Sequence, residues 1–232
     1  MSWSAALEGV ALTGEERQRL RKLLRLAVSS FRPARQPERA SVEGMADIAD
    51  AMRRQAPHAA AVSATGYLWK GRPPWADAAC VDALVQEAGQ VRPRAVRATN
   101  HLMVESAPGA REILERRGLA DFVHEHARAA APFVPTSTYY HWYETEQDFA
   151  EPHLDTEDFA VSVLMLLRHA RPPDGEARSA FFVCPPGGGP AEVALAVGEA
   201  VLMYSGSVVH ARSAPAPGEA VTTVSWGLKA GS

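Results

Sequence analysis

Short β-prone segments separated by turn residues fill the chain after Pro135, and this pattern constrains the fold more than any other feature. The segments are TSTYYHWYE, FAVSVLMLLR, SAFFVCP, AEVALAVGEAVLMYSG, SVVHARS and AVTTVSWGLK. Glycine- and proline-rich stretches such as RPPDGEAR, PPGGGPA and APAPGEA separate them, and these residues favour turns. Regular short strands of this kind are typical of a sandwich or barrel. We therefore predict a double-stranded β-helix, the cupin-like jelly-roll, over residues 136–229.

The first 135 residues have a mostly helical pattern. Thr13 and Glu16 have the spacing of a capping box and precede leucines at helical spacing. A second helix is expected before Pro57, and a third that Gly89 caps. A helix, or a pair of helices broken near Gly118, is expected to follow. The intervening segment RPRAVRATNHLMVES alternates in part and could be a strand.

Length and composition favour one folded α+β domain over residues 1–232, with the N-terminal helices packed against the jelly-roll. The chain has 232 residues, of which 47% are hydrophobic and 22% are charged, as in ordinary globular proteins. A formal net charge of −3 argues against a nucleic-acid partner or an anionic membrane surface. A homodimer is compatible with these numbers.

The sequence also predicts a cytoplasmic protein. It has no apolar run near the roughly 18 residues of a membrane span, and its N-terminus lacks the layout of a signal peptide. Cys80 and Cys184 lie far apart, so neither a disulfide framework nor a CxxC metal site is indicated.

The stretch EPHLDTEDF places His153 and Asp155 two residues apart, just before the apolar run FAVSVLMLL. Residues i and i+2 of a strand point to the same face, roughly 6–7 Å apart. An imidazole and a carboxylate in this arrangement can bind one metal ion. A polar turn that precedes a strand is the alternative interpretation, and under either one Glu157 and Asp158 are solvated turn residues.

A third ligand must come from a distant strand, and SVVHARS supplies His210. Two histidines and one carboxylate on one face of an octahedron are the ligand set of non-heme Fe(II) oxygenases. Most of the other histidines are expected to be solvated or structural, and His141 to pack or to line a pocket. These others are His58, His101, His124, His126 and His169.

Residues 136–229 resemble the Fe(II)/2-oxoglutarate-dependent dioxygenases, in texture the prolyl 4-hydroxylase type. The segment YETEQDFAEPHLD is similar to the family's Tyr-Glu, polar turn and Pro-His-x-Asp, with one extra residue. The strand FAVSVLMLLR, the turn and aromatic strand DGEARSAFF, and the lead-in GEAVLMYSGSVVH follow in the family's order. The N-terminal part contributes nothing to the resemblance.

The resemblance implies that His153, Asp155 and His210 bind Fe(II), and that the Tyr143 hydroxyl hydrogen-bonds the cosubstrate 2-oxoglutarate. O2 would be the second cosubstrate. Halogenating relatives of the family carry a small residue at the position of Asp155, so halogenation is not expected. The resemblance therefore predicts oxidation, most simply hydroxylation, of an unactivated C–H bond.

One family feature is missing from the sequence. Family members carry a Lys or Arg about ten residues after the distal histidine, to pair with the far carboxylate of 2-oxoglutarate, but Ala220 stands at this position. The substitute is Arg212, which on a continuing strand would face the same way as His210. Arg212 could equally be a surface residue. Thr222 and Thr223 could add a hydroxyl, whereas Arg168 is expected at the rim.

The expected substrate is a small molecule, such as an amino acid or a biosynthetic intermediate, because the chain shows no separate peptide- or nucleic-acid-binding domain. Tyr67, Trp69, Arg72 and Trp75 could form a lid, although ordinary packing explains them equally simply. Other functions are compatible with the same residues: an iron oxygenase that does not use 2-oxoglutarate, a non-catalytic jelly-roll that binds a metal or small ligand, and a zinc hydrolase.

Overall fold

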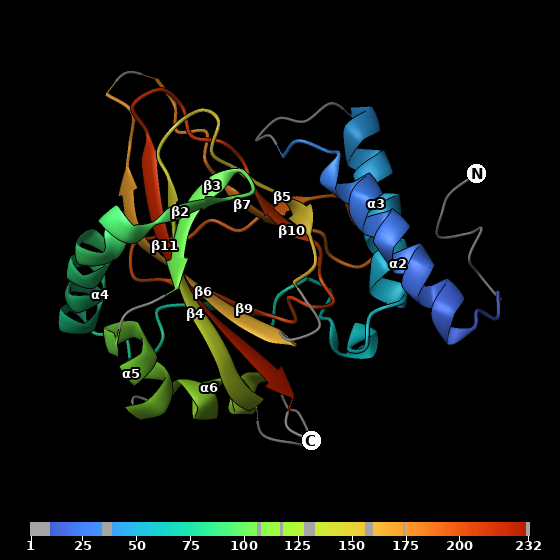
Figure 1. The fold of residues 1–232 in the computed structure, drawn as a ribbon, viewed down its shortest axis with the longest axis horizontal. Helices are drawn as coiled ribbons and strands as arrows, with labels where there is room; N and C mark the ends of the chain where they lie inside the picture. The colour runs from blue at the N-terminus through green and yellow to red at the C-terminus, as the bar shows by residue number, and fades with distance from the viewer. Residues whose placement is uncertain are drawn as a thin grey trace.

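Two antiparallel β-sheets form the centre of the molecule (Figure 1). The computed structural model describes residues 10–33, 39–105, 108–116, 118–127, 133–155, 160–173 and 175–230. The larger sheet has the order β1-β9-β6-β11-β4-β3-β2, from β1 (Trp69–Gly71), β9 (Ala200–Met203), β6 (Val161–Ala170), β11 (Ala220–Ala230), β4 (Phe133–Tyr143), β3 (His101–Glu105) and β2 (Val96–Ala98). The smaller has the order β5-β10-β7-β8, from β5 (Ala150–His153), β10 (His210–Arg212), β7 (Phe181–Val183) and β8 (Ala191–Glu192). The predicted α+β jelly-roll is confirmed.

Alternation along the central strands gives the larger sheet two different faces. On β4, Tyr140 and Trp142 belong to the main hydrophobic core, whereas His141 and Tyr143, at the intervening positions, line a cavity. Successive side chains of a strand point to opposite faces. Strand β6 is buried on both faces for most of its length, which agrees with its continuous apolar sequence.

Three helices cover the outer face of the larger sheet: α4 (Ala78–Val91), α5 (Pro108–Arg116) and α6 (Leu119–Ala127). Leu84 of α4 and Val123 of α6 are buried in the same core cluster as Trp226 of β11. The Trp226 indole Nε1 donates a hydrogen bond to the Ala110 carbonyl, at 2.8 Å. Because the helices occupy this face, the opposite face of the sheet is left to face the smaller sheet.

The helices α2 (Gly14–Ser29) and α3 (Arg39–Arg54) pack against each other beside the smaller sheet (Figure 1). Leu24, Val28 and Met52 form a cluster with Cys184 and Val209. The predicted capping box at the start of α2 is confirmed, with side-chain to backbone hydrogen bonds in both directions. Short 3₁₀ helices occur at η1 (Ala59–Ala61) and η2 (Arg92–Arg94). No helix in the described ranges is long and apolar enough to cross a bilayer.

Two expectations for the N-terminal part need correction. Strand β1 was not predicted, whereas β2 and β3 lie within RPRAVRATNHLMVES, the segment expected as a possible strand, and form two paired strands there. A strand of three residues such as β1 carries too few alternations to stand out in a sequence. Gly89 does not cap a helix, since α4 continues to Val91; burial of Ala88 and Val91 outweighs the roughly 1 kcal/mol cost of one helical glycine. The expected break at Gly118 is confirmed, with φ +75°.

The carboxylate of Glu87 on α4 joins three elements on the helical side of the larger sheet. It accepts hydrogen bonds from the backbone N–H of Gly109 at 2.6 Å and of Ala110 at 2.9 Å, in the first turn of α5. It also accepts a short hydrogen bond from the Tyr140 hydroxyl of β4. Glu87 therefore serves as a helix cap supplied from a neighbouring helix.

We expect Glu87→Ala to lower the free energy of unfolding by about 2–4 kcal/mol, because it leaves two helix N–H groups and a tyrosine hydroxyl without their charged acceptor. Urea unfolding followed by circular dichroism measures the change. Gln86→Ala, an exposed position on the same helix, is the matched control and should change stability by less than about 0.5 kcal/mol. Equal effects of the two substitutions would contradict the capping role.

Candidate metal centre and its cavity

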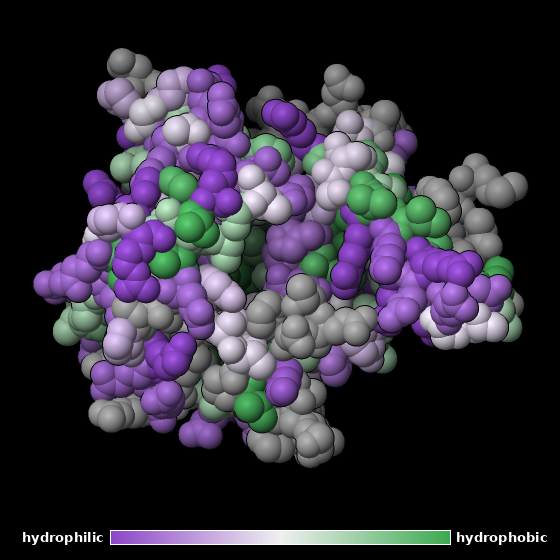
Figure 2. Space-filling view, viewed as in Figure 1, coloured by the Kyte–Doolittle hydropathy of each residue, from purple (hydrophilic) through white to green (hydrophobic). Residues whose placement is uncertain are grey.

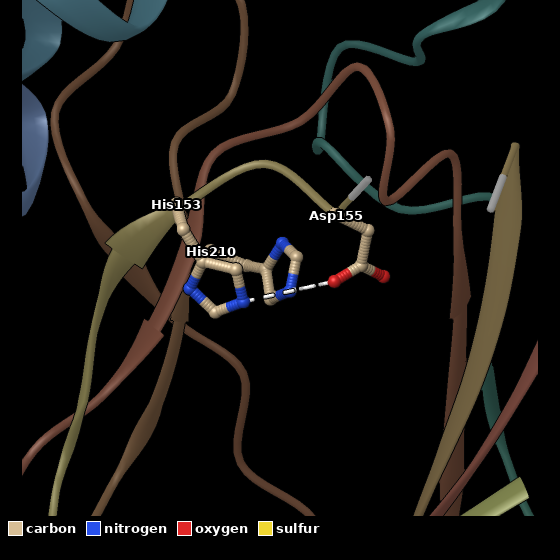
Figure 3. A group of neighbouring side chains, drawn as sticks. All are labelled: His153, Asp155 and His210. Carbon is tan, nitrogen blue, oxygen red and sulfur yellow. Dashed lines mark ion pairs between the residues drawn. The ribbon is translucent and has the colours of Figure 1, made fainter. Parts of the chain in front are cut away.

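The structure brings His153, Asp155 and His210 together on the smaller sheet (Figure 3). His153 is the last residue of β5 and His210 the first of β10, and the two are direct partners in the antiparallel register. Asp155 Oδ1 lies 3.6 Å from His153 Nε2 and 3.5 Å from His210 Nε2. One ligand atom from each residue lies within 4.8 Å of the others, so the three could share one metal ion.

Backbone contacts orient both imidazoles towards Asp155. The Nδ1 of His153 lies 2.6 Å from the Glu151 carbonyl, and that of His210 lies 3.0 Å from the Val208 carbonyl. A carbonyl can only accept, so each Nδ1 carries the proton and each Nε2 presents a lone pair. This second hydrogen bond is the usual support of a metal-binding histidine. The donor set, two imidazole nitrogens and a carboxylate, therefore suits a divalent transition metal.

Asp155 lies beyond the end of β5 and is held by hydrogen bonds with Ser205 and Ser162. Its backbone N–H donates to the Ser205 carbonyl at 3.0 Å, and its Oδ2 accepts from the Ser162 hydroxyl at 2.8 Å. The expectation that His153 and Asp155 share one face of a strand is wrong, because β5 ends at His153. The two side chains still converge, with Asp155 Oδ1 3.6 Å from His153 Nε2.

Electrostatics keeps the Asp155 carboxyl ionised. Burial is the largest influence and raises its pKa, but His210 and His153 together lower the pKa further, so the net pKa lies well below the usual range. An ionised carboxylate is the form that binds a metal ion, and a bound ion would replace the imidazole protons that face it.

A cavity of about 310 Å³ lies between the two sheets and includes this cluster. Its wall contains Tyr143, Phe181 and Arg212 on one side of the histidines, and Met103, Tyr139 and Ser225 along β3, β4 and β11. Figure 2 shows the surface hollowed on this side, between the part that carries β2 and β3 and the part that carries α2 and α3. The volume lies at the lower end of the range for small-molecule sites.

Arg212 is a buried residue of this cavity, with a relative exposure of 5%. Its guanidinium carbon lies 5.3 Å from the ring centre of Tyr143 and 5.8 Å from that of Phe181. Its Nη1 donates a long hydrogen bond of 3.4 Å to the Ser179 hydroxyl. Burial lowers the pKa of Arg212, whereas Tyr143 and Glu219 raise it. The interpretation of Arg212 as a surface residue is therefore wrong.

The other candidates for the cosubstrate carboxylate differ in exposure. The Thr223 hydroxyl is buried and has no hydrogen-bond partner among the described residues. Thr222 is only partly buried, and Arg168 is exposed, as expected for a rim position. Ala220 starts β11 and pairs with Ala170, so the position where the family carries its cation holds no charge here.

Glu219 holds the loops beside Arg212. Its carboxylate accepts hydrogen bonds from the backbone N–H groups of Arg178, Ser179 and Ala216, and lies 2.6 Å from His169 Nε2. Burial, the largest influence, raises the pKa of Glu219, but these hydrogen bonds together lower it further, and the net pKa lies below the ordinary value. The ionised form is thus the one that the fold stabilises.

Stability should therefore depend on pH through Glu219. A carboxyl whose pKa is lower in the folded state contributes stability above the unfolded pKa of about 4.3 and loses it as the pH falls through the folded value. We expect Glu219→Gln to cost about 1–3 kcal/mol at pH 7, and the gap from the unsubstituted protein to narrow below about pH 4. Urea unfolding between pH 7 and pH 3.5 tests this, and a gap that does not vary with pH would contradict it.

Three cavity residues were not predicted as a group: His101, His141 and Ser225. His101 was expected to be solvated or structural; it is buried on β3, and its ring stacks on Tyr143 with centroids 4.8 Å apart. His141 lies two residues before Tyr143 on β4, which was the available signal that both face the cavity. His101 carried no such signal because β3 reaches the cavity only through its pairing with β4.

The remaining polar and aromatic candidates have structural contacts. Trp69 packs against Phe122, and Trp75 against Trp226, so the packing interpretation of these two residues holds. Arg72 donates to the Val197 carbonyl, and Tyr67 packs beside the cluster of Phe181 and Val183. His58 stacks on Tyr204, and the His126 Nδ1 lies 2.9 Å from the Phe122 carbonyl. Glu157 and Asp158 lie outside the described residues.

Several solved structures with the same fold are described as 2-oxoglutarate-dependent or 2OG-Fe(II) proteins. The epimerase SnoN from nogalamycin biosynthesis, described as alpha ketoglutarate dependent, aligns with a TM-score of 0.59 at 17% identity, covering 83% of this chain and 84% of its own. A Pseudomonas putida prolyl-4-hydroxylase aligns at 0.56 and 19% identity, covering 72% of this chain and 94% of its own.

HygX from Streptomyces hygroscopicus, solved with nickel, 2-oxoglutarate and hygromycin B, aligns at 0.54 and 12% identity, covering 72% of this chain and 84% of its own. No family model matches the sequence, and no curated protein does. At these identities the likeness establishes the fold. The fold predicted from the resemblance to 2-oxoglutarate oxygenases is thereby confirmed.

Proposed function

We propose that this protein is an Fe(II)/2-oxoglutarate-dependent oxygenase that oxidises, most simply hydroxylates, an unactivated C–H bond of a small molecule. One observation carries the proposal: a His-Asp-His cluster and a buried, largely unneutralised arginine line the same cavity. The cluster suits the metal, and the arginine suits the distal carboxylate of a dicarboxylic cosubstrate.

The iron would be held by Nε2 of His153, Nε2 of His210 and Asp155 Oδ1. Once bound, Fe(II) with 2-oxoglutarate and O2 supplies the oxidising chemistry. The residues of the chain bind and orient. The carbonyls of Glu151 and Val208 keep the imidazole lone pairs on the metal side, and the Ser162 hydroxyl holds the second oxygen of Asp155.

Arg212 would take the far carboxylate of 2-oxoglutarate, with the Tyr143 hydroxyl beside it. The guanidinium has five donors, and the 3.4 Å contact with Ser179 uses one of them weakly. The buried Thr223 hydroxyl lacks a partner among the described residues and pairs across the sheet with His141 and Leu166. It is the candidate for an additional hydrogen bond to the cosubstrate.

A small-molecule substrate agrees with an interior cavity of about 310 Å³. The apolar walls, including Leu164, Phe181 and Met203, would exclude water from the reacting centre. Proteins with this fold include an epimerase and a carbocyclase as well as prolyl hydroxylases. Proteins with this fold thus carry out several reactions, and hydroxylation is the simplest of them.

Anaerobic titration with Fe(II), with and without 2-oxoglutarate, tests the proposal. We expect one iron per chain and a weak visible charge-transfer absorption only when both are present, followed by succinate formation on exposure to O2. Iron binding and O2 uptake without succinate would instead indicate an iron oxygenase that does not use 2-oxoglutarate. Stoichiometric metal without any turnover would indicate a non-catalytic binding protein.

A further inference from the structure

A chain of hydrogen bonds crosses three neighbouring strands at the wall of the cavity. The Nε2 of His101 on β3 lies 3.1 Å from Nδ1 of His141 on β4, and Nε2 of His141 lies 2.8 Å from the Ser225 hydroxyl on β11. All three residues line the cavity. Neither the metal cluster nor the Arg212 end of the site uses them.

The sheet register places the end of this chain on the metal side of the cavity. Ser225 pairs with Leu164 of β6, and the next position on the same face, Gly227, pairs with Ser162, which binds Asp155. Tyr143, beside Arg212, pairs with Val221 at the other end of β11. Ser225 therefore faces the space near the metal cluster, and Gly227 adds no side chain to fill it.

Both imidazoles in the chain are neutral at ordinary pH. Burial is the main cause in each case and lowers the pKa of His141 to about 3 and that of His101 to about 4. A neutral imidazole carries one N–H and one lone pair. Because both nitrogens of His141 are engaged, its proton must lie on one bond of the chain and its lone pair on the other.

The chain can therefore run in two senses. If His141 is protonated on Nε2, it donates to Ser225 Oγ and accepts from His101 Nε2–H, which leaves the Ser225 proton free to point into the cavity. If His141 is protonated on Nδ1, it donates to His101 Nε2 and accepts the Ser225 proton, which leaves serine lone pairs for the cavity. Both imidazoles stay neutral in either sense.

We propose that His101, His141 and Ser225 form a substrate-recognition wall, in which the Ser225 hydroxyl binds an uncharged polar group of the substrate and the two histidines set whether it donates or accepts. The inference rests on the proposed function and assigns the substrate class. Among the described residues that line the cavity, Arg212 and the cluster of His153, Asp155 and His210 are the groups assigned to the cosubstrate and the metal, and no Lys, Glu or further Arg or Asp lines it. A hydroxyl or carbonyl group therefore suits this wall, whereas a carboxylate or an ammonium would find no counter-ion beside Ser225.

The test uses four small probes that share one ring: cyclohexanol, cyclohexanone, cyclohexanecarboxylate and cyclohexylammonium. Dissociation constants and ¹⁵N shifts of the histidine rings are measured by NMR on ¹⁵N-histidine-labelled protein, both metal-free and loaded with Zn(II) and 2-oxoglutarate. We expect the two uncharged probes to bind more tightly than the charged ones. We also expect cyclohexanone, which only accepts, to shift His141 towards the Nε2–H tautomer.

Ser225→Ala should weaken binding of the uncharged probes about three- to tenfold, the effect of one lost neutral hydrogen bond. The matched control is Thr136→Val. It removes a hydroxyl of β4 that donates to the Gly227 carbonyl of β11 and that does not line the cavity. This substitution should change the affinity for the probes less than twofold. Tighter binding of a charged probe, or equal effects of the two substitutions, would overturn the proposal. Probe binding to the metal-free protein tests the wall independently of the proposed function. The proposed function fails only if the protein does not bind iron and 2-oxoglutarate together.

Discussion

Replacing Asp155 by alanine is expected to abolish succinate formation and to weaken Fe(II) binding by at least about 100-fold. Loss of a residue that only hydrogen-bonds a metal ligand already lowers metal affinity about 10- to 100-fold. Asp155 is the one carboxylate in the cluster, and the ion would lose both a ligand and the charge that offsets its own. Anaerobic Fe(II) titration and succinate assays measure the two effects. The fold should survive, because Asp155 is only partly buried and lies outside the strands of the sheet.

The control for this substitution is Asp82→Ala, which removes an exposed carboxylate from α4 on the far side of the larger sheet. It should leave iron binding unchanged. Circular dichroism and urea unfolding establish that both variants are folded. A folded Asp155→Ala protein that binds iron as tightly as the unsubstituted protein would show that this carboxylate is not a ligand.

Replacing Arg212 by alanine is expected to raise the dissociation constant of 2-oxoglutarate by about 10- to 100-fold. Hydrogen bonds to charged groups contribute about 1.5–3 kcal/mol, and 1.4 kcal/mol corresponds to a factor of ten. Within the described cavity lining, Arg212 is the one arginine and no lysine is present to pair with the far carboxylate. Titration of the charge-transfer absorption with 2-oxoglutarate measures the constant, and Fe(II) affinity without 2-oxoglutarate should change much less.

Arg212→Lys and Arg168→Ala complete this experiment. Lysine keeps the charge but not the bidentate geometry, so its effect should lie between those of arginine and alanine. Arg168 is exposed at the end of β6, and its replacement should change 2-oxoglutarate affinity less than twofold. An unchanged affinity in the folded Arg212→Ala protein would place the anchor elsewhere or favour a cosubstrate other than 2-oxoglutarate.

The two substitutions together distinguish the functions that the ligand set permits. Loss of turnover in both variants, with iron retained in Arg212→Ala, supports a 2-oxoglutarate oxygenase. Loss of turnover in Asp155→Ala alone supports an iron oxygenase with another cosubstrate. A metal-binding protein without catalysis would show iron loss in Asp155→Ala and no turnover in the unsubstituted protein.

The sequence by itself determined the β-rich half and the members of the metal cluster. Alternating and apolar segments between turn residues encode strands locally, so β4, β6, β7, β9, β10 and β11 were each predictable. The HxD pair and a later strand histidine were a sufficient signal for His153, Asp155 and His210, because few residue types bind metals and their spacing was informative.

Only the tertiary structure decided which face and which depth the other side chains occupy. Arg212 could have been a surface residue, and its burial depends on the packing of β10 between β5 and β7. His101 lies in a segment that alternates only in part, and it reached the cavity through pairing with β4. Burial and side-chain convergence arise from contacts between residues far apart in the chain, so a local pattern could name the metal cluster but not the wall that faces it.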